Sequence, residues 1–134
     1  QDDYFKKNIK ASLNTYLSYR FEGIVNQYFM RQCRKGNLPE VLDFGSFWYD
    51  DPKNNKNGQF DCVLKENDGY DFFEAKFYEK PMSLEECQKE EEQIKSLTSI
   101  HCKKIGFVSS AGFDFTDSDY ILITGQDLYS KDLD

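Results

Sequence analysis

One stretch of the sequence, residues 59–77, reads QFDCVLKENDGYDFFEAKF. It contains two runs rich in apolar residues, 59–65 and 70–77, on either side of Asn67-Asp68-Gly69. Asn, Asp and Gly are the residues that tight turns favour, because they tolerate the backbone angles such turns require. The pattern therefore predicts two strands that pair as an antiparallel hairpin.

The segments around this hairpin complete an α/β pattern. A helix is expected over residues 4–35, and a shorter helix over 4–14 joined through a bend near residues 14–18 is the alternative. One buried face of this helix is predicted at three-and-four spacing by Phe21, Ile24, Val25, Tyr28 and Phe29. The other expected elements are a strand at 44–49, a loop at 50–58, a helix from Ser83 to about 97, and strands at 104–109 and 120–124.

This order predicts a single domain over residues 1–134. Its central sheet is expected to be mixed, with an antiparallel meander first, then a crossover helix and further strands, flanked by helices in three layers. The crossover helix carries Ser83 and Glu86 in the spacing of a capping box. Its acidic run at 90–92 is expected to be a solvated surface.

The composition indicates a folded domain without a membrane segment. Of the 134 residues, 39% are hydrophobic, which is enough for a core, and no run approaches the roughly 18 apolar residues of a membrane helix. No apolar secretion signal follows the first charged residues, so a cytoplasmic protein with no membrane partner is expected. The four cysteines form no C-x-x-C pair, which argues against a structural zinc site and favours reduced thiols.

The charge is acidic overall but uneven. The net charge of −7 argues against a general nucleic-acid coat protein, because phosphate binding needs a cationic surface. Residues 1–36 nevertheless hold seven basic and three acidic residues. A local basic face on the first helix and a merely solvated helix surface both remain open.

Chemistry is expected at the end of the hairpin. Side chains alternate along a strand, so Glu74 and Lys76 share one face while Phe73, Ala75 and Phe77 take the other. Hairpin pairing would bring Asp61 of the preceding strand close to Glu74. Convergent carboxylates bind a hard divalent cation such as Mg²⁺, whose bound water can attack a phosphodiester. A neighbouring lysine that stays protonated would orient the water or stabilise charge on the phosphate.

This arrangement of Asp61 and Glu74-Ala75-Lys76 resembles the PD-(D/E)xK motif of the restriction-endonuclease-like fold. The resemblance implies that fold, a Mg²⁺- or Mn²⁺-dependent cleavage of DNA, and a glutamate on the first helix that completes the metal site. Glu22, which follows Phe21, occupies that place. The implied catalytic residues are Asp61, Glu74, Lys76 and Glu22, and the implied metal ligands are Asp61, Glu74 and Glu22.

A closer resemblance is to the C-terminal domain of unknown function of archaeal and bacterial AAA-type ATP-binding proteins. It covers roughly residues 16–125 and is carried by Phe21-Glu22, Trp48-Tyr49, the Asp61 strand and the run from Glu74 to Pro81. The position two before Asp61, often acidic in such domains, is Gln59 here. The resemblance implies an ATPase module on the same or a partner chain, and no G-x-x-x-x-G-K-[ST] pattern for ATP occurs in this sequence.

Two other functions are open on the sequence alone. The domain can be a catalytically silent interaction or regulatory domain, in which Glu74 and Lys76 form a structural salt bridge. It can also bind nucleic acid without cleavage through basic residues that gather near the first helix. These are Lys6, Lys7, Lys10, Arg20, Arg31, Arg34 and Lys35.

Overall fold

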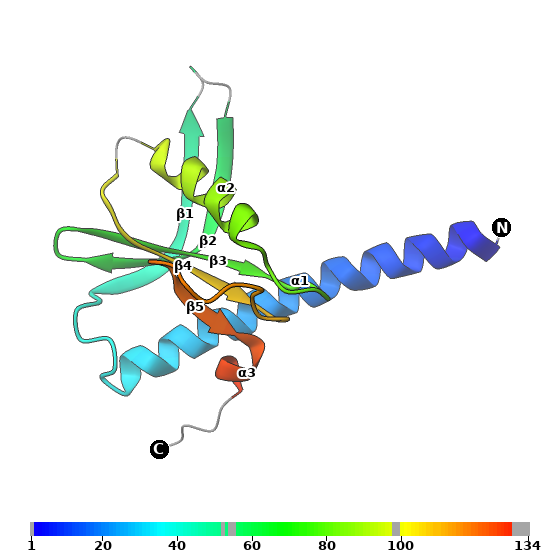
Figure 1. Cartoon of the computed structure of the whole chain (residues 1–134), viewed down its shortest axis with the longest axis horizontal. Helices are drawn as coiled ribbons and strands as arrows, with labels where there is room; N and C mark the ends of the chain where they lie inside the picture. The colour runs from blue at the N-terminus through cyan, green and yellow to red at the C-terminus, as the bar shows by residue number, and fades with distance from the viewer. Residues whose placement is uncertain (1, 52, 54–55, 98–99, 130–134) are drawn as a thin grey trace.

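A five-stranded mixed sheet forms the middle layer of the computed structural model (Figure 1). The structure describes residues 2–51, 53, 56–97 and 100–129, and the side chains of 13–47, 50, 53, 60, 62–97 and 100–129. The strands, which lie side by side in chain order, are β1 (Asp43–Asp51), β2 (Lys56–Glu66), β3 (Gly69–Lys76), β4 (Cys102–Ser109) and β5 (Ile121–Thr124). The first three pair antiparallel, and β3, β4 and β5 pair parallel. This confirms the predicted mixed sheet with a meander at its start.

Helices cover both faces of the sheet. The long helix α1 (Asp2–Arg34) packs on one face, and α2 (Leu84–Lys95), which connects β3 to β4, packs on the other (Figure 1). A crossover connection is what two neighbouring parallel strands require. The layered α/β architecture is therefore confirmed.

The first helix is continuous from Asp2 to Arg34, so the alternative with a bend is wrong. Phe21, Val25 and Phe29 are buried against the sheet, as their spacing predicts. The earlier part of α1 extends beyond the sheet (Figure 1). Among the described helices, none is long and apolar enough to cross a membrane.

The hairpin at residues 59–77 forms as predicted, but the loop before it is shorter than expected. β2 and β3 pair from Glu66↔Gly69 to Cys62↔Phe73, with Asn67 and Asp68 in the turn. The predicted loop at 50–58 is wrong at both ends, since Asp50 and Asp51 belong to β1 and pair with the start of β2. Pairing between strands has overridden the local turn preference of these polar residues.

The crossover helix begins as the capping box predicts. The Ser83 hydroxyl accepts a hydrogen bond from the Glu86 backbone N–H, and the Glu86 side chain accepts one from the Ser83 N–H. A short helix that was not predicted, α3 (Gly125–Leu128), begins with a second capping box between Thr124 and Asp127. Both helix starts satisfy backbone N–H groups that have no partner within the helix.

The expectation of a solvated acidic run at 90–92 is wrong for two of its three residues. Glu90 pairs with Lys76 of β3. Glu91 accepts a hydrogen bond from the Tyr120 hydroxyl at 2.6 Å and pairs with Lys95 at 2.9 Å. These carboxylates connect α2 to the sheet and to the segment before β5.

The sheet separates two hydrophobic clusters. The cluster under α1 includes Phe29 and Phe73, whose ring centroids are 4.7 Å apart. Phe73 in turn lies over Gly106 of β4, its pairing partner, where a Cβ would overlap the ring. The cluster under α2 includes Phe60, Phe72, Met82, Cys87, Ile94 and Phe107. Phe72 and Phe73, which are consecutive in β3, therefore pack into different hydrophobic clusters.

Candidate active site

Glu74 and Lys76 lie on the α2 face of β3, at the end of the strand. Phe73 and Ala75 pack into the cluster under α1, so the alternation of the strand turns Glu74 and Lys76 the other way. The Lys76 Nζ lies 3.9 Å from Glu74 Oε2 and 3.6 Å from Glu90 Oε1 of α2. The lysine thus stands between a carboxylate of its own strand and one of the crossover helix.

This group is neither fully buried nor freely solvated. The side chain of Glu74 is 12% exposed and that of Lys76 is 28% exposed. Burial lowers the pKa of the Lys76 ammonium, but the charges of Glu90 and Glu74 outweigh it and raise the pKa above its ordinary value. Lys76 is therefore a cation at neutral pH, suited to electrostatic stabilisation and not to removing a proton.

The backbone of Asp61 lies in β2, next to the last residue of that strand that pairs with β3. The pairing ends at Cys62↔Phe73, and Asp61 and Glu74 are the next residues of the two strands. The side chain of Asp61 is outside those that the structure describes. A register shift also falls here, because Gly45 pairs with Val63 whereas Phe47 pairs with Phe60, so β2 has one extra residue between the two pairs. Such bulges are common beside active sites, where they re-aim a side chain.

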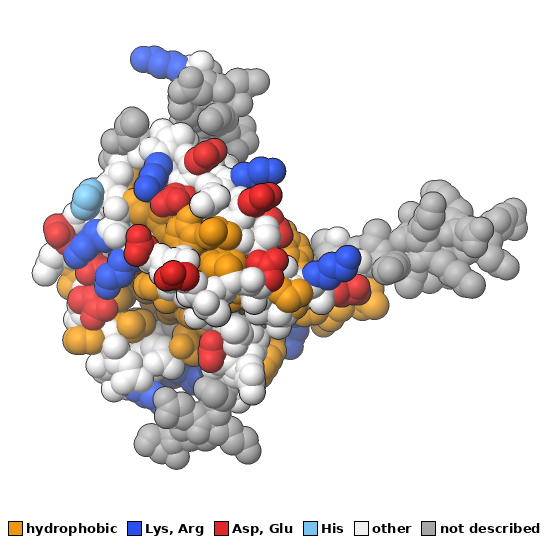
Figure 2. All heavy atoms as spheres, in the orientation of Figure 1, with side chains coloured by type: hydrophobic (Ala, Val, Ile, Leu, Met, Phe, Trp, Pro, Cys, Tyr) orange, Lys and Arg blue, Asp and Glu red, His pale blue; other side chains and the backbone are white. Residues whose placement is uncertain are grey.

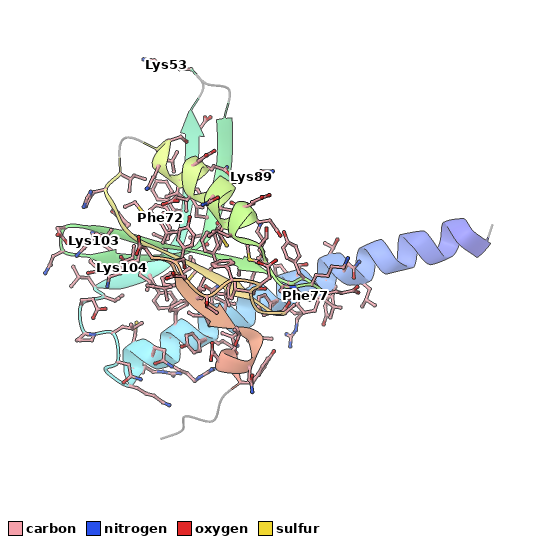
Figure 3. The ribbon with its side chains drawn as sticks, in the orientation of Figure 1. Lys53, Phe72, Phe77, Lys89, Lys103 and Lys104 are labelled. Atoms are coloured by element: carbon pink, nitrogen blue, oxygen red, sulfur yellow. The ribbon has the colours of Figure 1, made fainter. Side chains whose placement is uncertain are left out.

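Glu22 is half-buried on α1. Its neighbour Phe21 packs on Phe77, with ring centroids 5.6 Å apart, so this turn of α1 lies beside the chain just after Lys76. Figure 3 shows Phe77 against α1, where the helix leaves the sheet. The helix covers the face of β3 opposite to Glu74 and Lys76. A role for Glu22 as a metal ligand stays a prediction.

A groove of about 630 Å³ adjoins the end of β3. Its lining comes from α1, from the segment after Lys76 and from the first turn of α2, and consists of Asn14, Leu17, Phe77, Tyr78, Glu79, Lys80, Pro81 and Glu86. Figure 2 shows hydrophobic side chains along the described part of α1 beside it. The groove gives an extended ligand a place next to the strand that carries Glu74 and Lys76.

Two residues at this site were missed in the sequence. Glu90 belongs to the run that is expected to be solvated, and its contact with Lys76 arises because α2 packs on the face of β3 that carries Lys76. Ser109 pairs with Lys76 across β3 and β4, is fully buried, and its hydroxyl has no hydrogen-bond partner among the described residues. Alternation in the strand 104–109 would have placed it on the α2 face with Phe107.

Within the described side chains, no three His, Cys, Asp or Glu residues gather as a metal-binding group, and Asp61 is not among those side chains. A family model, DUF234, described as archaea bacterial proteins of unknown function, matches residues 1–96. No curated protein and no solved structure matches the chain. The matched residues include the hairpin, Glu74 and Lys76, and the whole of α2.

Proposed function

The chain belongs to this family of archaeal and bacterial proteins of unknown function, and we propose that it carries a metal-dependent nuclease site of the PD-(D/E)xK type. The observation that carries the proposal is the pair of Glu74 and Lys76 on one face of β3, with Asp61 next in register on β2. The proposed substrate is the phosphodiester backbone of DNA.

The residues fit a hard divalent cation in their chemistry. Carboxylate oxygens are the ligands that Mg²⁺ and Mn²⁺ prefer, and Glu74 presents one at the end of a strand. Asp61 and Glu74 would hold the ion; Glu22, on the helix that covers the opposite face of β3, stays a predicted third ligand. When bound, such an ion lowers the pKa of its water and offsets charge that develops on the phosphate.

Lys76 has the properties that the proposed chemistry asks of it. Its ammonium is held positive by Glu74 and Glu90, and its side chain remains accessible. In the proposed reaction it donates hydrogen bonds to a phosphate oxygen or to the attacking water, which stabilises the developing negative charge. Glu90 holds the ammonium in place before substrate arrives, and a phosphate oxygen would compete with it for the lysine.

The neighbouring groove has side chains that suit binding of the proposed DNA substrate. Its aromatic side chains, Phe77 and Tyr78, are exposed at the surface and can stack with bases. Lys80 supplies a cation in the same lining. The resemblance to C-terminal domains of ATP-binding proteins further leads us to propose that an ATPase module acts together with this site.

The experiment is a cleavage assay on plasmid and linear DNA with Mn²⁺ or Mg²⁺. We expect Lys76→Ala and Asp61→Asn to lower the rate at least about 100-fold, the size of effect seen when a preorganised electrostatic group is removed. Lys89→Ala is the matched control, because Lys89 is an exposed lysine of α2 (Figure 3). Cleavage that persists in both site variants would show that another site is responsible.

A second function, a silent interaction domain, is favoured by one specific observation. Large apolar side chains are exposed on the two segments that form the groove. They are Leu13 and Tyr16 of α1, next in sequence to the lining residues Asn14 and Leu17, and Phe77 and Tyr78 after β3, which line it. Exposed apolar patches of this kind mark protein interfaces. Loss of partner binding in Tyr16→Ser, with no DNA cleavage by the parent protein, would favour this function.

A further inference from the structure

The first part of α1 carries a row of apolar residues on the side of the helix away from the sheet. Figure 1 shows that this part of α1 extends beyond the sheet. Leu13 is 51% exposed and Tyr16 is 58% exposed. Residues three and four positions apart lie on one face of a helix, so Phe5 and Ile9 occupy the same face closer to the start of α1. We call these four residues the α1 stripe.

An apolar stripe on a helix is most useful when another element packs on it. Packing of such a face supplies most of the stability of a helix in a protein, whereas a short isolated helix is marginal in water. Residues 8–15 also include two asparagines, a serine and a threonine, which are weak helix formers. Continuous helix through this stretch therefore favours a partner along the α1 stripe.

Opposite charges stand at the two ends of the α1 stripe. Asp2 lies three residues before Phe5, and Arg20 lies four residues after Tyr16, so both positions fall on the face of the stripe. Arg20 is exposed. A stripe with an acid at its start and a base at its end is complementary to a second copy of itself when the two helices run antiparallel. A parallel pair would instead set like charges opposite each other, and charge complementarity of this kind fixes orientation and register.

We propose that α1 pairs with α1 of a second copy of this chain, antiparallel and along the α1 stripe. In the register that sets Asp2 opposite Arg20 of the second copy, the position of Phe5 faces Leu17 and that of Ile9 faces Leu13. Each of these pairings occurs twice, because the contact is related by a twofold axis. The paired stretch, residues 2–20, is about 27 Å long at about 1.5 Å per residue.

The proposed contact is compatible with the rest of the fold. Phe21, Val25 and Phe29, which pack on the sheet, follow a row of α1 on the opposite side from the α1 stripe. The sheets of the two copies would therefore lie on the outer sides of the helix pair. Asn14, which lines the groove beside β3, falls on the flank nearer to Phe21, so the groove stays open. The pairing therefore stands independently of whether the domain cleaves DNA or is a silent interaction domain.

The first test measures self-association of the full chain by analytical ultracentrifugation from about 1 µM to about 0.5 mM, the range expected for a small interface. We expect a reversible equilibrium between monomer and dimer. Leu13→Asp should weaken it at least about tenfold, because it buries a charge in the contact. Met30→Asp is the matched control, since Met30 is 44% exposed on α1 but lies ten residues beyond Arg20. A monomer at every concentration, or an equal effect of both variants, would overturn the proposal.

Charge reversal then tests the antiparallel register. We expect Arg20→Glu and Asp2→Lys each to weaken the dimer about tenfold, because each change makes two attractive pairs repulsive. The double variant, Asp2→Lys with Arg20→Glu, restores both pairs with their signs exchanged and should return the dissociation constant to within about threefold of the parent value. A double variant that dissociates as readily as either single variant would contradict the antiparallel pairing.

Discussion

The two ends of β3 hold carboxyl groups in opposite surroundings. At its end, on the α2 face, Glu74 and Glu90 flank a lysine that is partly open to water. Towards its start, on the α1 face, Asp71 lies beside Glu66 under nearly complete burial. One strand thus carries an accessible charged group on one face and an enclosed carboxyl pair on the other.

The comparison shows how burial changes the protonation of charged side chains on the two faces of β3. In the accessible group, the charges of Glu90 and Glu74 raise the pKa of Lys76, which stays a cation. In the enclosed group Lys103 and Lys104 engage Glu66, and burial keeps the proton on Asp71 near neutral pH. The first arrangement leaves a lysine and its carboxylates beside water, and the second holds a hydrogen bond between two carboxyl groups.

The largest expected effect separates the two groups by activity. Glu74→Gln should lower Mn²⁺-dependent DNA cleavage at least about 100-fold, because it removes a proposed metal ligand and a charge next to Lys76. Asp71→Asn, the same loss of an acid on the other face, should leave cleavage within about twofold in the same assay. Equal loss in both variants would mean that the faces act as one site.

The next effect is a pH dependence of stability that belongs to the enclosed pair. The pKa of Asp71 is raised from 3.8 to about 7 on folding, so its contribution is present at low pH and is lost as the pH rises from about 4 to 7. We expect the free energy of unfolding, measured by urea denaturation, to fall by about 1–3 kcal/mol over that range. Glu66, with its pKa lowered to about 2, acts in the opposite sense between pH 2 and 4.5.

Asp71→Asn serves as the check on this assignment. Because the amide does not titrate, the decline between pH 4 and 7 should disappear, whereas Asp117→Asn, the same change at an exposed site, should retain it. A decline that is the same in all three proteins would place its origin in other groups.

A smaller effect concerns the packing of the α1 face. Gly106→Ala would place a methyl group against the ring of Phe73, whose centroid lies 4.7 Å from that of Phe29. We expect a loss of about 1–3 kcal/mol in the free energy of unfolding by urea denaturation, the usual cost of overpacking. Gly45→Ala in β1, where a Cβ would meet nothing within 4 Å, is the control and should change stability little.

The smallest expected effect is on the accessible face. Glu90→Gln removes one partner of Lys76, so the lysine pKa measured by NMR should fall while stability changes by less than about 1 kcal/mol. A large loss of stability would instead assign the lysine a structural role, as the silent-domain alternative requires.

Local signals in the sequence predicted the elements that depend on them. The hairpin turn at Asn67 and Asp68 and the capping box at Ser83 were found because each is set by residues close in sequence. The loop at 50–58 was overestimated because pairing of β1 with β2 is not encoded locally. The short helix α3 was missed because four residues carry no periodic pattern.

The site residues also differ in whether local sequence or distant segments determine their positions. Alternation along one strand placed Glu74 and Lys76 together, and this needed no knowledge of distant segments. The contact with Glu90 was missed because it depends on how α2 lies across the sheet. Asp71 was overlooked although a signal existed, since it lies on the same face as Phe73, where an apolar residue would be expected.

Calorimetric titration with Mn²⁺ tests the central claim most directly. We predict that the parent protein and Asp71→Asn bind the ion with similar affinity, and that Glu74→Gln and Asp61→Asn each weaken binding at least about tenfold. Binding that is unchanged in Glu74→Gln and Asp61→Asn would contradict the account, because the ion would then lie away from the end of β3.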